Sequence, residues 1–322
     1  MSLKVLWQDD TTARPARELD LRAALEVRFA DAAEAHAARD WPDVLVCGDP
    51  SEEQLDGARL RRVVVPWAGV GARLRERALA RPHLTVHNSH FNDAMVAQHA
   101  LALLLAVTNR VVAADRAMRR GDWGDDHDER HLGVQLAGKV ALLVGYGAIG
   151  RALRPSLEAL GMEVRAYRRR PRADGSVREY GPGKLHEALA AADAVVVSLP
   201  ATPDTEGLLG AAELARLKPT AALVNVGRGK VIDEEALYRA LAAGRLLGAG
   251  IDVWYRYPKR EPLERVFPSA YPFQELDNVV MSPHRGNDVR DWQRVAARDV
   301  LATLTALAAG EERNRVDLES GY

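Results

Sequence analysis

Several features are scarce in this sequence, and each absence narrows the class of protein. Cys47 is the single cysteine, so an intramolecular disulfide is excluded. The longest apolar stretch, residues 100–107, is far too short to span a bilayer. Lys and Arg number 44 and Asp and Glu number 45. The chain therefore lacks the excess of basic residues that is typical of nucleic-acid-binding proteins. We therefore expect a soluble cytoplasmic protein with no nucleic-acid or membrane partner and no metal site.

Strand and helix patterns alternate along most of the chain, which is typical of α/β proteins with parallel sheets. The chain has 322 residues, enough for two domains. The strands predicted from apolar patterns are 3–7, 44–47, 62–67, 84–87, 140–144, 164–167, 194–199, 222–226, 248–253 and 279–282. The predicted helices include residues 18–26, 149–160, 94–120 and 288–309.

A glycine pattern follows the strand predicted at 140–144. Gly145, Gly147 and Gly150 form Gly-x-Gly-x-x-Gly between that strand and the helix predicted from Ile149. Such a turn brings backbone N–H groups and the positive end of a helix to a pyrophosphate. The strand–turn–helix–strand context therefore predicts a dinucleotide-binding site.

The end of the second strand of this unit indicates which dinucleotide binds. Proteins that bind NAD usually carry Asp or Glu there, to accept a hydrogen bond from the ribose 2′-hydroxyl. Here the sequence has Arg168, Arg169 and Arg170 and no carboxylate. Guanidinium groups bind a 2′-phosphate, so we expect a preference for NADP(H), with NAD(H) as the alternative. A solvated basic loop is the other interpretation.

Six further motifs occur in a fixed order along the chain. They are Ala68-Gly69-Val70, Val96-Ala97-Gln98-His99, Ser198-Leu199-Pro200, Asn225-Val226-Gly227-Arg228-Gly229, Ile251-Asp252-Val253 and Ser282-Pro283-His284. Together they resemble the D-isomer-specific 2-hydroxyacid dehydrogenases, the family that includes formate dehydrogenase and phosphoglycerate dehydrogenase. The resemblance covers nearly the whole chain, with Gln98 in place of the family's Glu.

The resemblance implies a fold and a domain organisation. We expect a Rossmann-type, doubly wound parallel sheet inserted into a smaller, flavodoxin-like α/β substrate domain. Residues 1–110 and 288–322 would form the substrate domain, and residues 111–287 the dinucleotide-binding domain. The active site would lie in the cleft between them, and members of this family commonly form homodimers through the nucleotide domain.

The resemblance also implies roles for individual residues. Arg228 would hold the carboxylate and polarise the carbonyl of a 2-oxo acid, and His284 would donate or accept the hydroxyl proton. The expected cofactor-binding residues are Gly145, Gly147, Ala148, Ile149, Gly150, Arg168, Arg169, Arg170, Leu199, Pro200, Val226, Gly227, Arg228, Asp252, His284 and Gly286. The expected substrate-binding residues are Ala68, Gly69, Val70, Asn92 and Arg228. Asp252 would contact the nicotinamide carboxamide.

One position departs from the family pattern. Tyr257 stands where the family normally has the Glu that pairs with the histidine and raises its pKa. Three interpretations are open. Glu261 replaces the missing carboxylate, Tyr257 orients His284 through its hydroxyl and leaves the histidine pKa lower, or the family reaction has been lost.

The leading functional hypothesis is an NADP(H)-dependent enzyme that interconverts small 2-oxo and 2-hydroxy acids, as glyoxylate and hydroxypyruvate reductases do. The missing Glu motivates a rival from another class, a dinucleotide-sensing binding protein like the corepressors of the family. Formate oxidation is a weaker alternative, because formate dehydrogenases have Gln where this chain has Tyr257.

Overall fold

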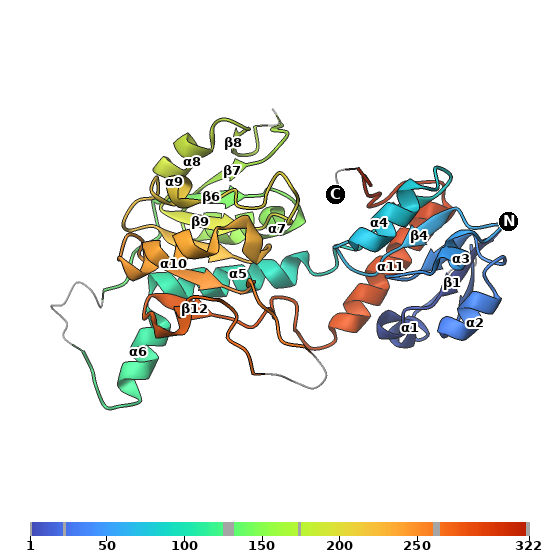
Figure 1. Ribbon diagram of the computed structural model, residues 1–322, viewed down its shortest axis with the longest axis horizontal. Helices are drawn as coiled ribbons and strands as arrows, with labels where there is room; N and C mark the ends of the chain where they lie inside the picture. The colour runs from blue at the N-terminus through green and yellow to red at the C-terminus, as the bar shows by residue number, and fades with distance from the viewer. Residues whose placement is uncertain (1, 22–23, 125–131, 173–174, 260–264, 320–322) are drawn as a thin grey trace. The chain divides into compact units, whose positions relative to one another are not determined.

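The computed structural model describes the chain except for residues 1, 22–23, 125–131, 173–174, 260–264 and 320–322. It divides into two compact units (Figure 1). Unit 1 comprises residues 1–92 and 289–322, and unit 2 comprises residues 93–288. Each unit is built on its own parallel sheet.

Unit 1 contains a five-stranded parallel sheet with strand order β2-β1-β3-β4-β5. This order is the one found in flavodoxin-like folds. The strands are β1 (Leu3–Trp7), β2 (Leu25–Phe29), β3 (Val44–Val46), β4 (Arg62–Val64) and β5 (Thr85–His87). The helices are α1 (Asp10–Ala16), α2 (Ala32–Ala37), α3 (Glu52–Leu55), α4 (Ala72–Leu79) and α11 (Trp292–Ala308).

Alternating side chains of these strands build two cores, one on each face of the sheet. Val5 and Trp7 of β1 pack with α1 and α11, whereas Leu6 between them packs with α2, α3 and α4. Because both faces of the sheet are covered, the inner strand β3 is apolar and buried at every position, and β1 and β4 carry one polar residue each. The chain's last helix therefore completes the unit that the N-terminal residues begin.

Unit 2 contains a seven-stranded parallel sheet with strand order β12-β11-β10-β9-β6-β7-β8. The strands are β6 (Val140–Val144), β7 (Glu163–Tyr167), β8 (Arg178–Tyr180), β9 (Ala194–Val197), β10 (Ala222–Asn225), β11 (Gly248–Ile251) and β12 (Val279–Met281). The chain runs outward from β6 in one direction and then returns to β9 on its other side. Ligands of doubly wound sheets bind beyond the carboxyl ends of the strands at such a reversal. The predicted fold class is confirmed.

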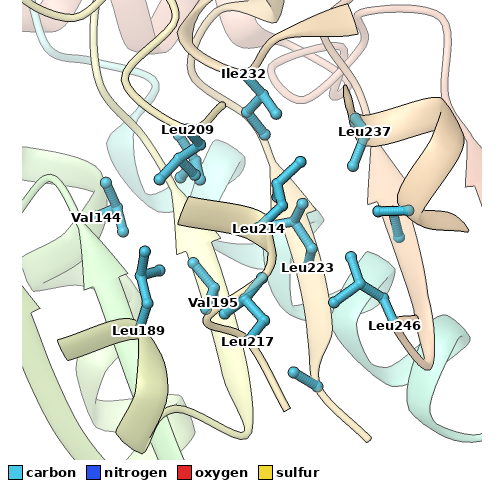
Figure 2. Close-up of a cluster of buried hydrophobic side chains, with 14 of the residues drawn as sticks. Val144, Leu189, Val195, Leu209, Leu214, Leu217, Leu223, Ile232, Leu237 and Leu246 are labelled. Atoms are coloured by element: carbon cyan, nitrogen blue, oxygen red, sulfur yellow. The ribbon is translucent and has the colours of Figure 1, made fainter. Parts of the chain in front are cut away.

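Helices cover both faces of the sheet in unit 2. α5 (Asp93–Thr108) and α7 (Ala148–Ala159) bury one face. α8 (Leu185–Ala191), α9 (Ala211–Leu214) and α10 (Glu234–Ala242) bury the other, whose aliphatic core is shown in Figure 2. Short 3₁₀ helices span Gly229–Val231 and Phe273–Glu275.

The helix predicted at 94–120 is two helices. α5 ends at Thr108, and α6 (Val111–Met118) begins after Arg110, whose φ of 52° is left-handed. α6 projects from the rest of unit 2 (Figure 1). In the described part of the chain no single helix has the length and apolar composition to cross a membrane; by those criteria alone the pair α5–α6 does, with a bend of 61°.

Two other expectations differ from the structure. The helix predicted at 18–26 is wrong, because β2 begins at Leu25 and adds an edge strand beside β1. The unit boundary falls between Asn92 and Asp93 rather than near residue 110, because α5 packs on β10, β11 and α7 of unit 2. The apolar segment 100–107 thus lies in a core helix of unit 2.

Candidate active site

The turn after β6 has the backbone features that a pyrophosphate cradle requires. Gly145 has a φ of +100°, which favours glycine. A Cβ at Gly150 would lie 2.8 Å from the carbonyl oxygen of Gly145, so only glycine lets the helix start so close to the turn. A Cβ at Gly147 would have nothing within 4 Å, which leaves open space at the N-cap of α7. Ala148 and Ile149 begin that helix, whose free N–H groups suit an anion.

The three arginines after β7 differ in their surroundings. Arg169 and Arg170 are exposed, whereas Arg168 pairs with Glu179 of β8 at 3.4 Å. The Glu179 side chain is nearly buried and also accepts the backbone N–H of Arg172 at 2.5 Å. The sequence analysis did not identify β8, so it missed this carboxylate beside the arginines.

The loops after β9 and β10 approach each other closely. A Cβ at Gly227 would lie 2.5 Å from the carbonyl oxygen of Leu199, so the β10 loop needs glycine there. At Gly229 a Cβ would lie 2.3 Å from the carbonyl oxygen of Trp254, in the loop after β11. Thr205 Oγ1 donates to the carbonyl of Pro200 at 2.6 Å and orders the β9 loop. Three neighbouring loops therefore form one packed layer.

Arg228 stands exposed between two buried glycines in this layer. Asn225 fixes its backbone: the amide Nδ2 donates to the Arg228 carbonyl at 3.1 Å, and Oδ1 accepts the N–H of Gly227 at 3.1 Å. Arg228 Nη1 donates to the carbonyl of Gly227 at 2.7 Å. Val226 is buried. The guanidinium is thus an accessible cation on a rigid support.

Asp252, which follows β11, lies at the centre of a hydrogen-bond cluster that the sequence analysis did not identify. Its Oδ1 accepts from Ser282 Oγ at 2.5 Å and from the Arg285 N–H at 2.9 Å, and its Oδ2 accepts from the Gly286 N–H at 3.0 Å. His99 Nε2 lies 3.2 Å from Oδ1. Burial opposes ionisation, but the hydrogen bonds from His99, Ser282 and Arg285 outweigh it and lower the pKa of Asp252 to about 2.

Three of these four donors share Oδ1, whereas the Gly286 N–H donates to Oδ2, so Oδ2 has spare acceptor capacity. The contact of Asp252 with the nicotinamide carboxamide remains a prediction. Within the protein, Asp252 fixes the two residues that follow His284.

His284 follows β12 and has a φ of 55°, a left-handed conformation that is unusual for a residue other than glycine. Partial desolvation of the ring lowers the pKa of His284. The Arg228 cation lowers it further, whereas the carboxylates of Asp252 and Asp288 oppose both effects. The histidine and Arg228 are therefore close enough to interact electrostatically, although they follow different strands.

Tyr257 contacts His284 through its ring and not through its hydroxyl. The ring centroids lie 5.4 Å apart, and the hydroxyl accepts the Trp254 N–H at 3.0 Å. The hydroxyl therefore does not orient the histidine, as one of our interpretations required. Glu261 lies outside the described residues. Trp254 is buried, and its indole N–H donates to the Ser282 carbonyl at 2.8 Å.

The predicted substrate loop lies in unit 1, after β4. Asn88 Nδ2 donates to the carbonyl of Ala68 at 2.7 Å, and Val70 packs against the core formed with α4. Gly69 is partly exposed, and Asn92 is the last residue of the N-terminal segment of this unit. The loop is thus anchored at both sides of Gly69, whose N–H group remains a predicted ligand of a carboxylate.

Comparisons with known proteins agree with this geometry. Residues 101–286, more than half of the chain, match the family model of the D-isomer specific 2-hydroxyacid dehydrogenase NAD binding domain. The chain belongs to this family, as the motifs indicated. A glyoxylate reductase of Pyrococcus furiosus is 36% identical over 222 residues, which are 67% of this chain and 63% of that protein. The match therefore spans less than two thirds of this relative's own length.

Solved structures of the family resemble both units. A D-isomer specific 2-hydroxyacid dehydrogenase from Xanthobacter autotrophicus, in complex with NADPH and MES, is 28% identical with a TM-score of 0.80, and the match covers 100% of both chains. An NADPH-dependent glyoxylate/hydroxypyruvate reductase from Sinorhizobium meliloti is 26% identical with a TM-score of 0.72, covering 99% of this chain and 98% of that one.

Proposed function

We propose that this protein is an NADP(H)-dependent oxidoreductase that reduces small 2-oxo acids of the glyoxylate and hydroxypyruvate class to 2-hydroxy acids. One observation carries the proposal. The exposed guanidinium of Arg228 and the imidazole of His284, a residue with a left-handed backbone, follow strands of the sheet that also bears the glycine turn, at the carboxyl ends of those strands. The relatives named glyoxylate reductase and glyoxylate/hydroxypyruvate reductase support this substrate class.

Arg228 would bind the substrate. A planar guanidinium engages a carboxylate and a neighbouring carbonyl oxygen together, and it polarises the carbonyl toward attack at carbon. The buried glycines on either side fix the backbone, so little ordering of the loop is needed on binding. In unit 1, the N–H groups of Gly69 and Val70 would bind the carboxylate, with Ala68 and Asn92 beside them.

His284 would donate a proton to the carbonyl oxygen during reduction and take it back during oxidation. Its pKa lies below the ordinary value, so the free protein carries mostly neutral imidazole at neutral pH. Reduction needs the protonated form. We therefore expect kcat/KM for reduction to fall as the pH rises through this lowered pKa, and oxidation to be favoured above it.

The residues present fit a dinucleotide. The left-handed Gly145, the open space at Gly147 and the N-terminus of α7 suit a pyrophosphate, and Ala148, Ile149 and Gly150 shape that helix start. Leu199, Pro200, Val226, Gly227 and Gly286 would line the nicotinamide side. When bound, the nicotinamide supplies the hydride. Arg168, Arg169 and Arg170 would favour the 2′-phosphate of NADP(H).

We further propose a homodimer. No residue of α6 is buried, and Val111 and Met118 of this helix are exposed at 52% and 45%. Trp123, which follows it, is 83% exposed. A second copy that covered this surface would remove much apolar area from water. The mass in solution tests this: a single-chain mass at micromolar concentration would contradict the proposal.

Turnover of NADPH and NADH with a panel of 2-oxo acids, from glyoxylate to phenylpyruvate and across pH 5 to 9, tests the function. We expect NADPH to be preferred. His284→Ala should abolish turnover but keep NADPH affinity, since the glycine turn is unchanged; near-normal rates would exclude the proposed role. Tight NADPH binding with no turnover on any acid would favour a dinucleotide sensor, and NAD-dependent turnover of formate would favour the third hypothesis.

A further inference from the structure

His99 belongs to a motif of the sequence that the proposed reaction does not use. It lies on α5, and its side chain is 24% exposed. Nε2 lies 2.9 Å from Ser282 Oγ and 3.2 Å from Asp252 Oδ1. The Ser282 hydroxyl donates its proton to Asp252, so it accepts from His99. His99 Nε2 therefore carries a hydrogen and acts as a donor to this cluster.

The packing of α5 on β11 explains why His99 reaches Asp252. A Cβ at Gly248 would lie 3.2 Å from Val107 Cγ1, and a Cβ at Gly250 would lie 2.8 Å from Leu103 Cβ. The two glycines thus let the helix approach the strand closely.

Because the two elements have similar repeat distances along this contact, the next pair of facing residues also meets. Four residues of helix rise about 6 Å, and two residues of strand rise about 6.6 Å. Stepping back four residues from Leu103 along α5 leads to His99, and stepping forward two residues from Gly250 leads to Asp252. Glycines that seat the helix in this way also fix the register of the histidine against the carboxylate.

We propose that His99 is a positioning residue for His284, an inference that rests on the proposed function for its catalytic consequence. His99 donates Nε2–H to Ser282 and Asp252, and Asp252 accepts the N–H groups of Arg285 and Gly286. These bonds hold the left-handed backbone at His284. Without His99, a buried carboxylate loses one of its donors, and its bonds to the loop weaken.

Two substitutions of His99 test its hydrogen-bond donor and its ring shape separately. His99→Gln places an amide N–H near the position of Nε2, whereas His99→Phe keeps a ring but removes the donor. Gln98→Ala is the matched control, because Gln98 is exposed on the same helix and contributes nothing to the cluster in the described structure. Ser282→Ala removes the bridging hydroxyl and serves as the second variant if His99→Phe does not fold.

Amide hydrogen exchange at Arg285 and Gly286 reads the positioning without substrate or cofactor. We expect exchange about 10-fold faster in His99→Phe and Ser282→Ala, where local opening costs less, and rates like the natural chain in His99→Gln and Gln98→Ala. Unchanged exchange in both His99→Phe and Ser282→Ala overturns the proposal. Equal exchange in His99→Gln and His99→Phe also overturns it, because the donor would then be irrelevant.

Kinetics provide the second readout. We expect His99→Phe to lower kcat about 10- to 100-fold through misplacement of His284, with NADPH affinity and substrate KM within about 2-fold, and His99→Gln to recover most of kcat. A rise in KM with unchanged kcat would overturn the catalytic part. If the natural chain turns over no 2-oxo acid, the proposed function fails, but the exchange rates still decide whether His99 positions the loop.

Discussion

Arg228 and His284 follow two strands that flank β11, yet different forces hold their loops. The Arg228 loop has an extended backbone, with φ −141° and ψ 141°, and is fixed by close backbone packing at Gly227 and Gly229. The His284 loop has a left-handed residue and is fixed by the carboxylate of Asp252. The Arg228 loop thus depends on close packing at glycines and on the neutral amide of Asn225, whereas the His284 loop depends on a buried charge.

The two loops should therefore differ in their sensitivity to pH and to nearby charges. Close packing of backbone atoms has no titratable group, so the Arg228 loop should be insensitive to pH. The Asp252 cluster is ionic, and Asp252 also raises the pKa of His284 against the desolvation of the ring. Changes in charge near His284 therefore alter both the geometry and the protonation of the candidate acid.

Substitution of the buried carboxylate should have the largest effect. Asp252→Asn keeps the shape but places an N–H group opposite one of the backbone N–H donors that Asp252 now accepts. It also removes the charge that favours protonated His284. We expect kcat/KM for reduction to fall about 100-fold. The measurement is steady-state kinetics; a loss below about 3-fold would mean that Asp252 does not support His284.

The Arg228 loop should instead be disrupted by a steric clash. Gly227→Ala places a Cβ 2.5 Å from the Leu199 carbonyl oxygen, so backbone must move. We expect a loss of about 1–3 kcal/mol in the free energy of unfolding and a fall in kcat/KM that is the same at pH 6 and pH 8. Gly71→Ala is the control, because a Cβ there meets nothing within 4 Å. Equal stability of the two variants would contradict the packing explanation.

The fold was predictable where local patterns and the tertiary environment agree. The apolar strands of both sheets, the glycine turn and α7 follow the predicted ranges to within a few residues, because both faces of each sheet are buried. The strands β2 and β8 were missed, whereas the other two edge strands, β5 and β12, were predicted. β2 and β8 each carry two charged residues, such as Arg178 and Glu179 of β8, so their apolar periodicity is weak.

The site was predictable only in part, for a similar reason. Glycines that a close approach requires are visible in the sequence, and so are Arg228 and His284 in their motifs. His99, Ser282 and Asp252 meet because α5 packs on β11, a pairing between residues about 150 positions apart that no local pattern encodes. The available signal was the alternation of Gly248 and Gly250, because glycines on one face of a strand often mark the close approach of another element.

Tyr257 stands where the family normally has Glu, so restoring the carboxylate tests how charge sets the pKa of His284. Tyr257→Glu would place a carboxylate beside a histidine whose pKa is lowered, and an adjacent negative charge favours the imidazolium. We expect the pH at which reduction declines to rise by about 1 unit. The pH dependence of kcat/KM measures this shift, because it reports the free protein.

Tyr257→Gln is the control for that experiment. It removes the same ring contact and adds no charge, so the decline should stay close to its original pH. A shift of the same size in both variants would mean that the Tyr257 ring, which lies against His284, sets the pKa through desolvation.

We expect the smallest effect at the predicted cofactor side of the same sheet, where a carboxylate pairs with an arginine of the loop after β7. Glu179 pairs with Arg168 and places a carboxylate near the expected 2′-phosphate. Glu179→Gln removes a repulsive charge and frees Arg168, so the ratio of kcat/KM for NADPH to that for NADH should rise about 2- to 5-fold, as expected from removing one partly screened charge. Arg168→Gln should lower the ratio. If Glu179→Gln lowers it as well, Glu179 helps binding by orienting Arg168, and this loop, like that of His284, depends on a carboxylate for its shape.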